Sequence, residues 1–108
     1  MKVKNMTSAH GNKVANQFII TDGNKVTFQS YDSEIVTIDY DNGTIFVGHN
    51  WDYSTTTGKY RNLFMHNNYF YEMETKKGFQ KVINASELVT RHRTFKIIKE
   101  WEVAECFN

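Results

Sequence analysis

Hydrophobic and polar residues alternate along the first half of the chain, in short runs separated by turn residues. Residues 18–21 and 26–31 are two such runs, and the sequence D-G-N lies between them. Val26 and Phe28 fall on one face of the second run, because successive side chains of a strand point to opposite sides. We therefore predict a β-hairpin over these residues.

A second hairpin is indicated by the Asn-Gly pair at residues 42–43. Residues 34–40 alternate again, and residues 44–47 form a short apolar run. Asn-Gly favours a tight turn in which both central residues have positive φ, and it is the strongest short-range hairpin signal. The pattern predicts four strands, paired as two hairpins, before residue 48.

The hydrophobic period then changes from two to about three and a half residues, which indicates helix. Tyr60 and Phe64 fall on one helical face, and Asp52 or Ser54 is suited to cap the free amides of a first turn. We predict one helix over residues 54–67.

The last third of the chain predicts one more helix and one more strand. Residues 74–84 place Phe79, Val82 and Ile83 at helical spacing, and residues 94–103 return to period two. The apolar face of that strand consists of Phe95, Ile97, Trp101 and Val103, and Lys99 interrupts it.

These elements predict an α+β fold. The sheet should be antiparallel with four to five strands, the two helices should pack on one side, and the order should be β-β-β-β-α-α-β. Residues 1–15 are polar, so we predict a flexible N-terminal arm there and a single domain over residues 16–108.

Charge and cysteine content narrow the function. Lys and Arg number 13 against 12 Asp and Glu, a net charge of +1, which argues against a generally cationic nucleic-acid binder. Cys106 is the only cysteine, which favours a reducing compartment. The sequence contains no run of eighteen apolar residues, so it predicts no membrane-spanning helix. We expect a cytoplasmic protein of unknown oligomeric state.

No self-sufficient catalytic, metal-binding or cofactor-binding constellation occurs in the sequence. His10, His49, His66 and His92 are far apart, and none has a metal-ligand spacing. Glycine-rich phosphate loops are absent. The third-ranked hypothesis is an enzyme, namely a small nuclease that uses His49 and His66.

Basic residues gather between positions 59 and 99. If they share one face, they favour a nucleic-acid-binding module, which is our alternative hypothesis; the same residues are candidates for contact with a protein partner. The candidates are Lys59, Arg61, Lys76, Lys77, Lys81, Arg91, Arg93 and Lys96.

An aromatic segment joins the strand-rich half to the helix-rich half. We predict that it is mainly a structural junction, in which the rings of Trp51 and Tyr53 pack between the strand exit and the helix. Its remaining members are Asp52, Ser54, Tyr60 and Phe64, and they should cap the helix or enter the core.

Residues 28–33, a hairpin, and the string W-D-Y-S-x-T-T-x-K-Y-R at residues 51–61 together resemble a family of small uncharacterised proteins. That family is encoded by phages and mobile elements of Gram-positive bacteria. The resemblance implies a phage or mobile-element context. Together with the missing catalytic groups, this context favours a non-enzymatic protein that binds a host protein or ribonucleoprotein, and its specific form is an anti-CRISPR-like inhibitor of a Cas effector.

Overall fold

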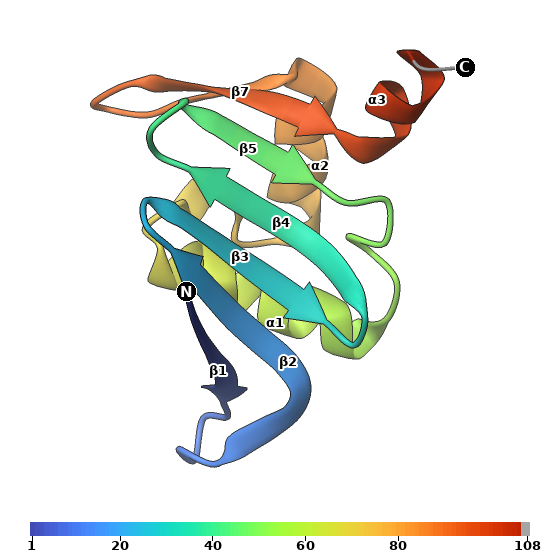
Figure 1. Ribbon diagram of the computed structural model, residues 1–108. Helices are drawn as coiled ribbons and strands as arrows, with labels where there is room; N and C mark the ends of the chain where they lie inside the picture. The colour runs from blue at the N-terminus through green and yellow to red at the C-terminus, as the bar shows by residue number, and fades with distance from the viewer. Residues whose placement is uncertain (107–108) are drawn as a thin grey trace.

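Seven strands form one mixed sheet in the computed structural model, which describes residues 1–106 (Figure 1). Across the sheet the strands run in the order β1-β2-β3-β4-β5-β7-β6. Neighbours are antiparallel except for β5 and β7, which are parallel. The strands are β1 (Lys2–Thr7), β2 (Lys13–Asp22), β3 (Lys25–Ser30), β4 (Ser33–Asp39), β5 (Thr44–Val47), β6 (Glu87–Val89) and β7 (Thr94–Lys99).

Helices α1 (Thr55–Asn67) and α2 (Lys76–Ala85) lie behind the same face of the sheet (Figure 1). A short 3₁₀ helix, η1 (Tyr71–Met73), connects them. Helix α3 (Glu100–Cys106) follows β7 directly. Because β5 and β7 are parallel, the chain must cross from one end of the sheet to the other between them, and the two long helices lie within this crossover.

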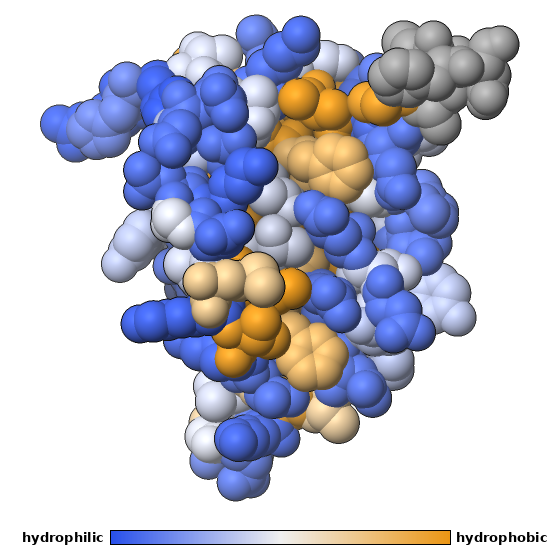
Figure 2. Space-filling model, viewed as in Figure 1, coloured by the Kyte–Doolittle hydropathy of each residue, from blue (hydrophilic) through white to orange (hydrophobic). Residues whose placement is uncertain are grey.

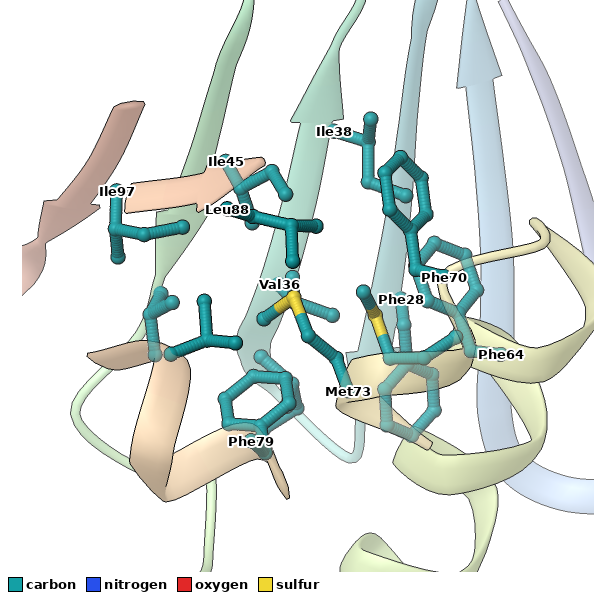
Figure 3. Packing of buried hydrophobic residues seen from close by; sticks show 14 of the residues in the cluster. Phe28, Val36, Ile38, Ile45, Phe64, Phe70, Met73, Phe79, Leu88 and Ile97 are labelled. Carbon is teal, nitrogen blue, oxygen red and sulfur yellow. The ribbon is translucent and has the colours of Figure 1, made fainter. Parts of the chain in front are cut away.

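The hydrophobic core lies between the sheet and the two long helices (Figure 3). Ile38, Ile45 and Ile97 are register partners across β4, β5 and β7, and each is at most 4% exposed. Phe64 and Phe79 extend from the helices into the same core and are fully buried. Burying each of these side chains contributes roughly 1.5–3 kcal/mol, so packing rather than helix propensity holds the helices in place.

The other face of the sheet carries a second row of side chains. Thr27, Thr37, Phe46 and Ile98 are register partners that point away from the helices. In Figure 2 this face shows apolar side chains among hydrophilic ones. Thr27, Phe46 and Ile98 are only partly covered, so this face is apolar in places without being a second core.

Both predicted hairpins are confirmed, as β2–β3 and β4–β5. Both predicted helices also form, with bounds Thr55–Asn67 and Lys76–Ala85. Ser54 is the N-cap of α1, since its Oγ accepts the Thr57 amide at 3.1 Å.

The predicted antiparallel sheet of four to five strands in the order β-β-β-β-α-α-β is wrong. Strands β1 and β6 extend the sheet at its two edges, and the β5–β7 pair makes it mixed. The predicted strand over residues 94–103 is also wrong at its end. It stops at Lys99, and Glu100 and Glu102 lie in the first turn of α3, where carboxylates favour a helix start.

The segment predicted as a flexible arm, residues 1–15, contains β1 and the first residues of β2. Lys2 to Asn5 pair with residues 18–21 of β2. The predicted domain extends to residue 108, and residues 107–108 lie outside the described residues. In the part of the chain that the structure describes, no helix is long and apolar enough to cross a membrane.

Candidate functional site

Arg61 lies inside the protein, beside a stacked pair of aromatic rings. Its guanidinium carbon is 5.3 Å from the ring centroid of Trp51 and 5.1 Å from that of Phe79. Nη1 donates a hydrogen bond of 2.8 Å to the carbonyl of Trp51 and lies 3.6 Å from a carboxylate oxygen of Asp52. Burial lowers the pKa of Arg61, and Asp52 partly offsets that effect. Arg61 is 1% exposed, so this candidate for contact with a partner lies inside the protein.

The other basic residues do not form one surface. Lys76 pairs with Asp52 at 2.8 Å, and Arg93 lies over the ring of Phe95 at 4.9 Å. Lys96 points to the sheet face opposite the helices, because its neighbour Ile97 is in the core. The basic side chains of residues 59–99 therefore do not all lie on the same face of the protein. The exposed candidates are Lys59, Lys76, Lys77, Lys81, Arg91, Arg93 and Lys96.

The residues of the predicted structural junction differ in where they lie. Trp51 stacks on Phe79 with ring centroids 5.2 Å apart. Tyr60 and Phe64 are 6% and 0% exposed. The prediction that Tyr53 packs between strand exit and helix is wrong, since this residue is 70% exposed. The junction therefore leaves one large ring free at the surface.

Tyr53 borders a cleft of about 570 Å³ at the start of α1. Residues 30–33, in and beside the β3–β4 turn, contribute to its lining, and so do Asn50 and several residues at the start of α1. We call this feature the α1 cleft. It brings together two segments that are about twenty residues apart in the sequence.

A chain of buried hydroxyl groups fixes the base of the α1 cleft. The Thr57 Oγ1 lies 2.9 Å from the Ser30 Oγ and accepts a hydrogen bond of 3.2 Å from the Ser54 Oγ. Thr57 is fully buried, and Ser30 is 2% exposed. Buried polar groups without partners are costly, so this network fixes how the first turn of α1 sits on β3.

Two exposed tyrosines flank the α1 cleft. Tyr31 is 46% exposed and adopts φ of 55°, in the left-handed region that costs an ordinary side chain about 1–2 kcal/mol. Its amide donates a hydrogen bond of 2.7 Å to the carbonyl of Asn16, which holds the turn in place. Strain of this kind often marks a functional position. The sequence predictions did not single out Tyr31. The signal that could have identified it is a large residue at a turn position that suits Gly or Asn.

The two histidines considered for a nuclease each contact one carboxylate. His49 Nδ1 lies 2.8 Å from Glu100 Oε2, and His66 Nδ1 lies 2.6 Å from Glu74 Oε2. The amide and ring of His49 lower the pKa of Glu100. Within residues 1–106, no group of three or more His, Cys, Asp or Glu is placed to hold a metal ion.

The fold and the cleft define a small α+β domain with two helices on one sheet face and an open, hydroxyl-lined site at the start of α1. The chain belongs to the family of unknown function DUF8033, whose sequence model matches residues 1–81. A search of curated proteins found no match, and a search of solved structures found none. The matched region contains the whole α1 cleft, whereas Arg91, Arg93 and Lys96 lie beyond it.

Proposed function

We propose that this protein is a non-catalytic binding protein of a phage or mobile element, that it acts on a host protein in the cytoplasm, and that the α1 cleft is its binding surface. One observation carries the proposal. Residues 28–33 and 51–61, the two stretches that resemble phage proteins, both contribute to the lining of this cleft. A surface shared by a family is expected within the region that the family has in common, and the cleft meets that condition.

Exposed tyrosines at the cleft support binding to a protein. Tyr31 and Tyr53 present large, rigid rings with a polar tip, and tyrosine is enriched among the residues that dominate binding energy at protein interfaces. The buried hydroxyl network beneath them makes the site rigid, which reduces the entropy lost on binding.

The most specific form of the proposal is an inhibitor of a bacterial defence system that blocks a CRISPR effector by direct contact. The resemblance to phage and mobile-element proteins supports it, by analogy alone. A co-expressed effector should lose plasmid interference when the protein is present. Full interference with every effector type carried by suitable hosts would contradict this form of the proposal.

The general proposal is tested by affinity purification from lysates of a Gram-positive host. The wild-type protein should retain a specific host protein, identified by mass spectrometry. The double variant Tyr31→Ser/Tyr53→Ser should lose it. Tyr69→Ser/Tyr71→Ser is a matched control, because Tyr69 and Tyr71 are also exposed but lie outside the cleft. Equal retention by both double variants would contradict the assignment of the surface.

Nucleic-acid binding through residues 59–99 receives less support from the geometry. Arg61 is enclosed, Lys76 is paired with Asp52, and Lys96 points to the opposite sheet face. A gel shift that weakens with salt and disappears in Arg91→Ala/Arg93→Ala would favour this alternative over protein binding.

A further inference from the structure

We propose that the α1 cleft accepts an arginine side chain presented by the partner protein. This inference rests on the proposed function and names the chemistry of its binding site. It follows from the hydrogen-bonding groups that remain free in the cleft, from its charge and from its exposed rings.

The cleft contains a carboxylate and further polar groups that can accept hydrogen bonds. The hydroxyls of Ser30, Ser54 and Thr57 are engaged with one another. Asn50 donates one of its side-chain amide hydrogens to the Ser33 Oγ at 2.9 Å, and its side-chain oxygen Oδ1 remains to accept. Among the described residues, the exposed carboxylate of Asp32 has no hydrogen-bond or ion-pair partner. An ionised carboxylate only accepts hydrogen bonds, so it suits a ligand that is rich in donors, as a guanidinium is.

The charge of the cleft has the sign that a cation requires. Asp32 is the one charged residue among those that line it. A smaller cavity of about 200 Å³ shares Asp32 and adds Glu34 and Glu100 to the same end of the sheet. The nearby lysines, Lys59 and Lys76, line a separate cleft on α1. An anionic ligand such as a phosphate is therefore disfavoured at Asp32.

The exposed rings favour arginine over lysine. A planar guanidinium stacks on aromatic faces and donates in a fork that matches a carboxylate, whereas an ammonium does neither as well. The protein uses the same chemistry internally, because Arg61 lies against two rings and near Asp52, and Arg93 lies over Phe95. At the cleft, Tyr31 and Tyr53 supply the rings and Asp32 supplies the carboxylate. None of the residues that line the cleft supplies the cation.

The test is a titration of the ¹⁵N-labelled protein, in which the chemical shifts of its backbone amides are measured by NMR. The probe is N-acetyl-arginine amide, and the matched controls are N-acetyl-lysine amide and N-acetyl-citrulline amide, the latter an uncharged analogue of arginine. We expect arginine to shift the amides of residues 30–33 and 50–57 in a saturable manner. Lysine should bind more weakly, and citrulline should cause no saturable shift.

Substitution of the carboxylate checks the assignment. Asp32→Asn should weaken binding of the arginine probe about fivefold, the effect of removing an exposed ion pair. The control is Asp22→Asn, which removes an exposed carboxylate at the opposite end of β2 and β3. It should leave binding of the arginine probe unchanged.

Three results would overturn the inference: equal binding of citrulline and arginine, shifts that map outside the cleft, or full affinity in Asp32→Asn. The host-protein purification separates this failure from that of the proposed function. If Asp32→Asn retains the partner as wild type does and the Tyr31/Tyr53 double variant loses it, the arginine inference fails alone. If no host protein is retained, the proposed function fails, and the titration still decides whether arginine binds.

Discussion

The two sides of the start of α1 use similar residues in opposite ways. On one side, the guanidinium of Arg61 is buried against the stacked rings of Trp51 and Phe79, with 1% of the residue exposed. On the other side, Tyr31 and Tyr53 are exposed around the α1 cleft, and Asp32 has no cation. The first arrangement is complete within the chain, and the second lacks its cationic member.

This difference separates stability from binding. A closed set of rings and charges contributes its interaction energy to folding, so its loss should destabilise the protein. Exposed rings and an exposed carboxylate contribute little to folding and remain available to a partner. Substitutions on the two sides should therefore affect different measurements.

The largest expected effect is that of Arg61→Ala. It removes the cation–π contacts with both rings and leaves the Trp51 carbonyl without its donor, so the free energy of unfolding should fall by about 2–4 kcal/mol. Urea unfolding followed by tryptophan fluorescence measures it. Lys59→Ala, an exposed residue on the same helix, should change stability by less than about 0.5 kcal/mol. Equal effects of the two substitutions would remove the distinction between the sides.

A smaller loss is expected for Thr57→Val, which keeps the shape but removes the hydroxyl between Ser30 and Ser54. The buried Ser30 would lose its partner, at a cost of about 1–3 kcal/mol. Thr56→Val, an exposed neighbour, is the control and should be nearly neutral. Chemical denaturation of both variants shows whether the base of the cleft is held by this network; equal stabilities would argue against it.

Tyr31→Asn should separate stability from binding most clearly. Asparagine tolerates positive φ better than tyrosine, so stability should stay the same or rise by up to about 1 kcal/mol. Retention of the host protein should fall at the same time. A loss of more than 1 kcal/mol would mean that the ring of Tyr31 serves the fold.

The smallest effect concerns Glu100 and pH. Its pKa lies below the ordinary value of 4.5, chiefly because the amide of His49 donates to it. Its carboxylate therefore stabilises the folded state above about pH 4.5, and this contribution is lost as the pH falls through the lowered pKa. The stability difference between wild type and Glu100→Gln should shrink as the pH is lowered from 7 to 3.

The backbone and side-chain contributions to this effect can be told apart. His49→Ala keeps the main-chain donor, so it should preserve the larger part of the pH dependence. If His49→Ala abolishes the pH dependence, the imidazole and not the amide is the main cause.

Local signals predicted the hairpins and the helices, because turn and cap chemistry act over a few residues. The Asn-Gly pair predicted the β4–β5 hairpin, and Ser54 predicted the start of α1. The parallel pairing of β5 and β7 depends on contacts about fifty residues apart, and β6 is three residues long, so neither leaves a periodic pattern.

The position of Arg61 could have been predicted from helical spacing. Thr57, Arg61 and Phe64 share the buried face of α1 at positions i, i+4 and i+7. The charge of Arg61 favours exposure, although a guanidinium can be buried when rings and acceptors surround it. The α1 cleft was harder to predict, because it forms only when the β3–β4 turn meets the start of α1.

The most direct test of the central claim is site-specific photo-cross-linking in host cells. A benzoylphenylalanine at position 53, at the rim of the cleft, should cross-link to a discrete host protein. The same residue at position 69, which is as exposed but lies outside the cleft, should not. Cross-links from position 69 and none from position 53 would contradict the account.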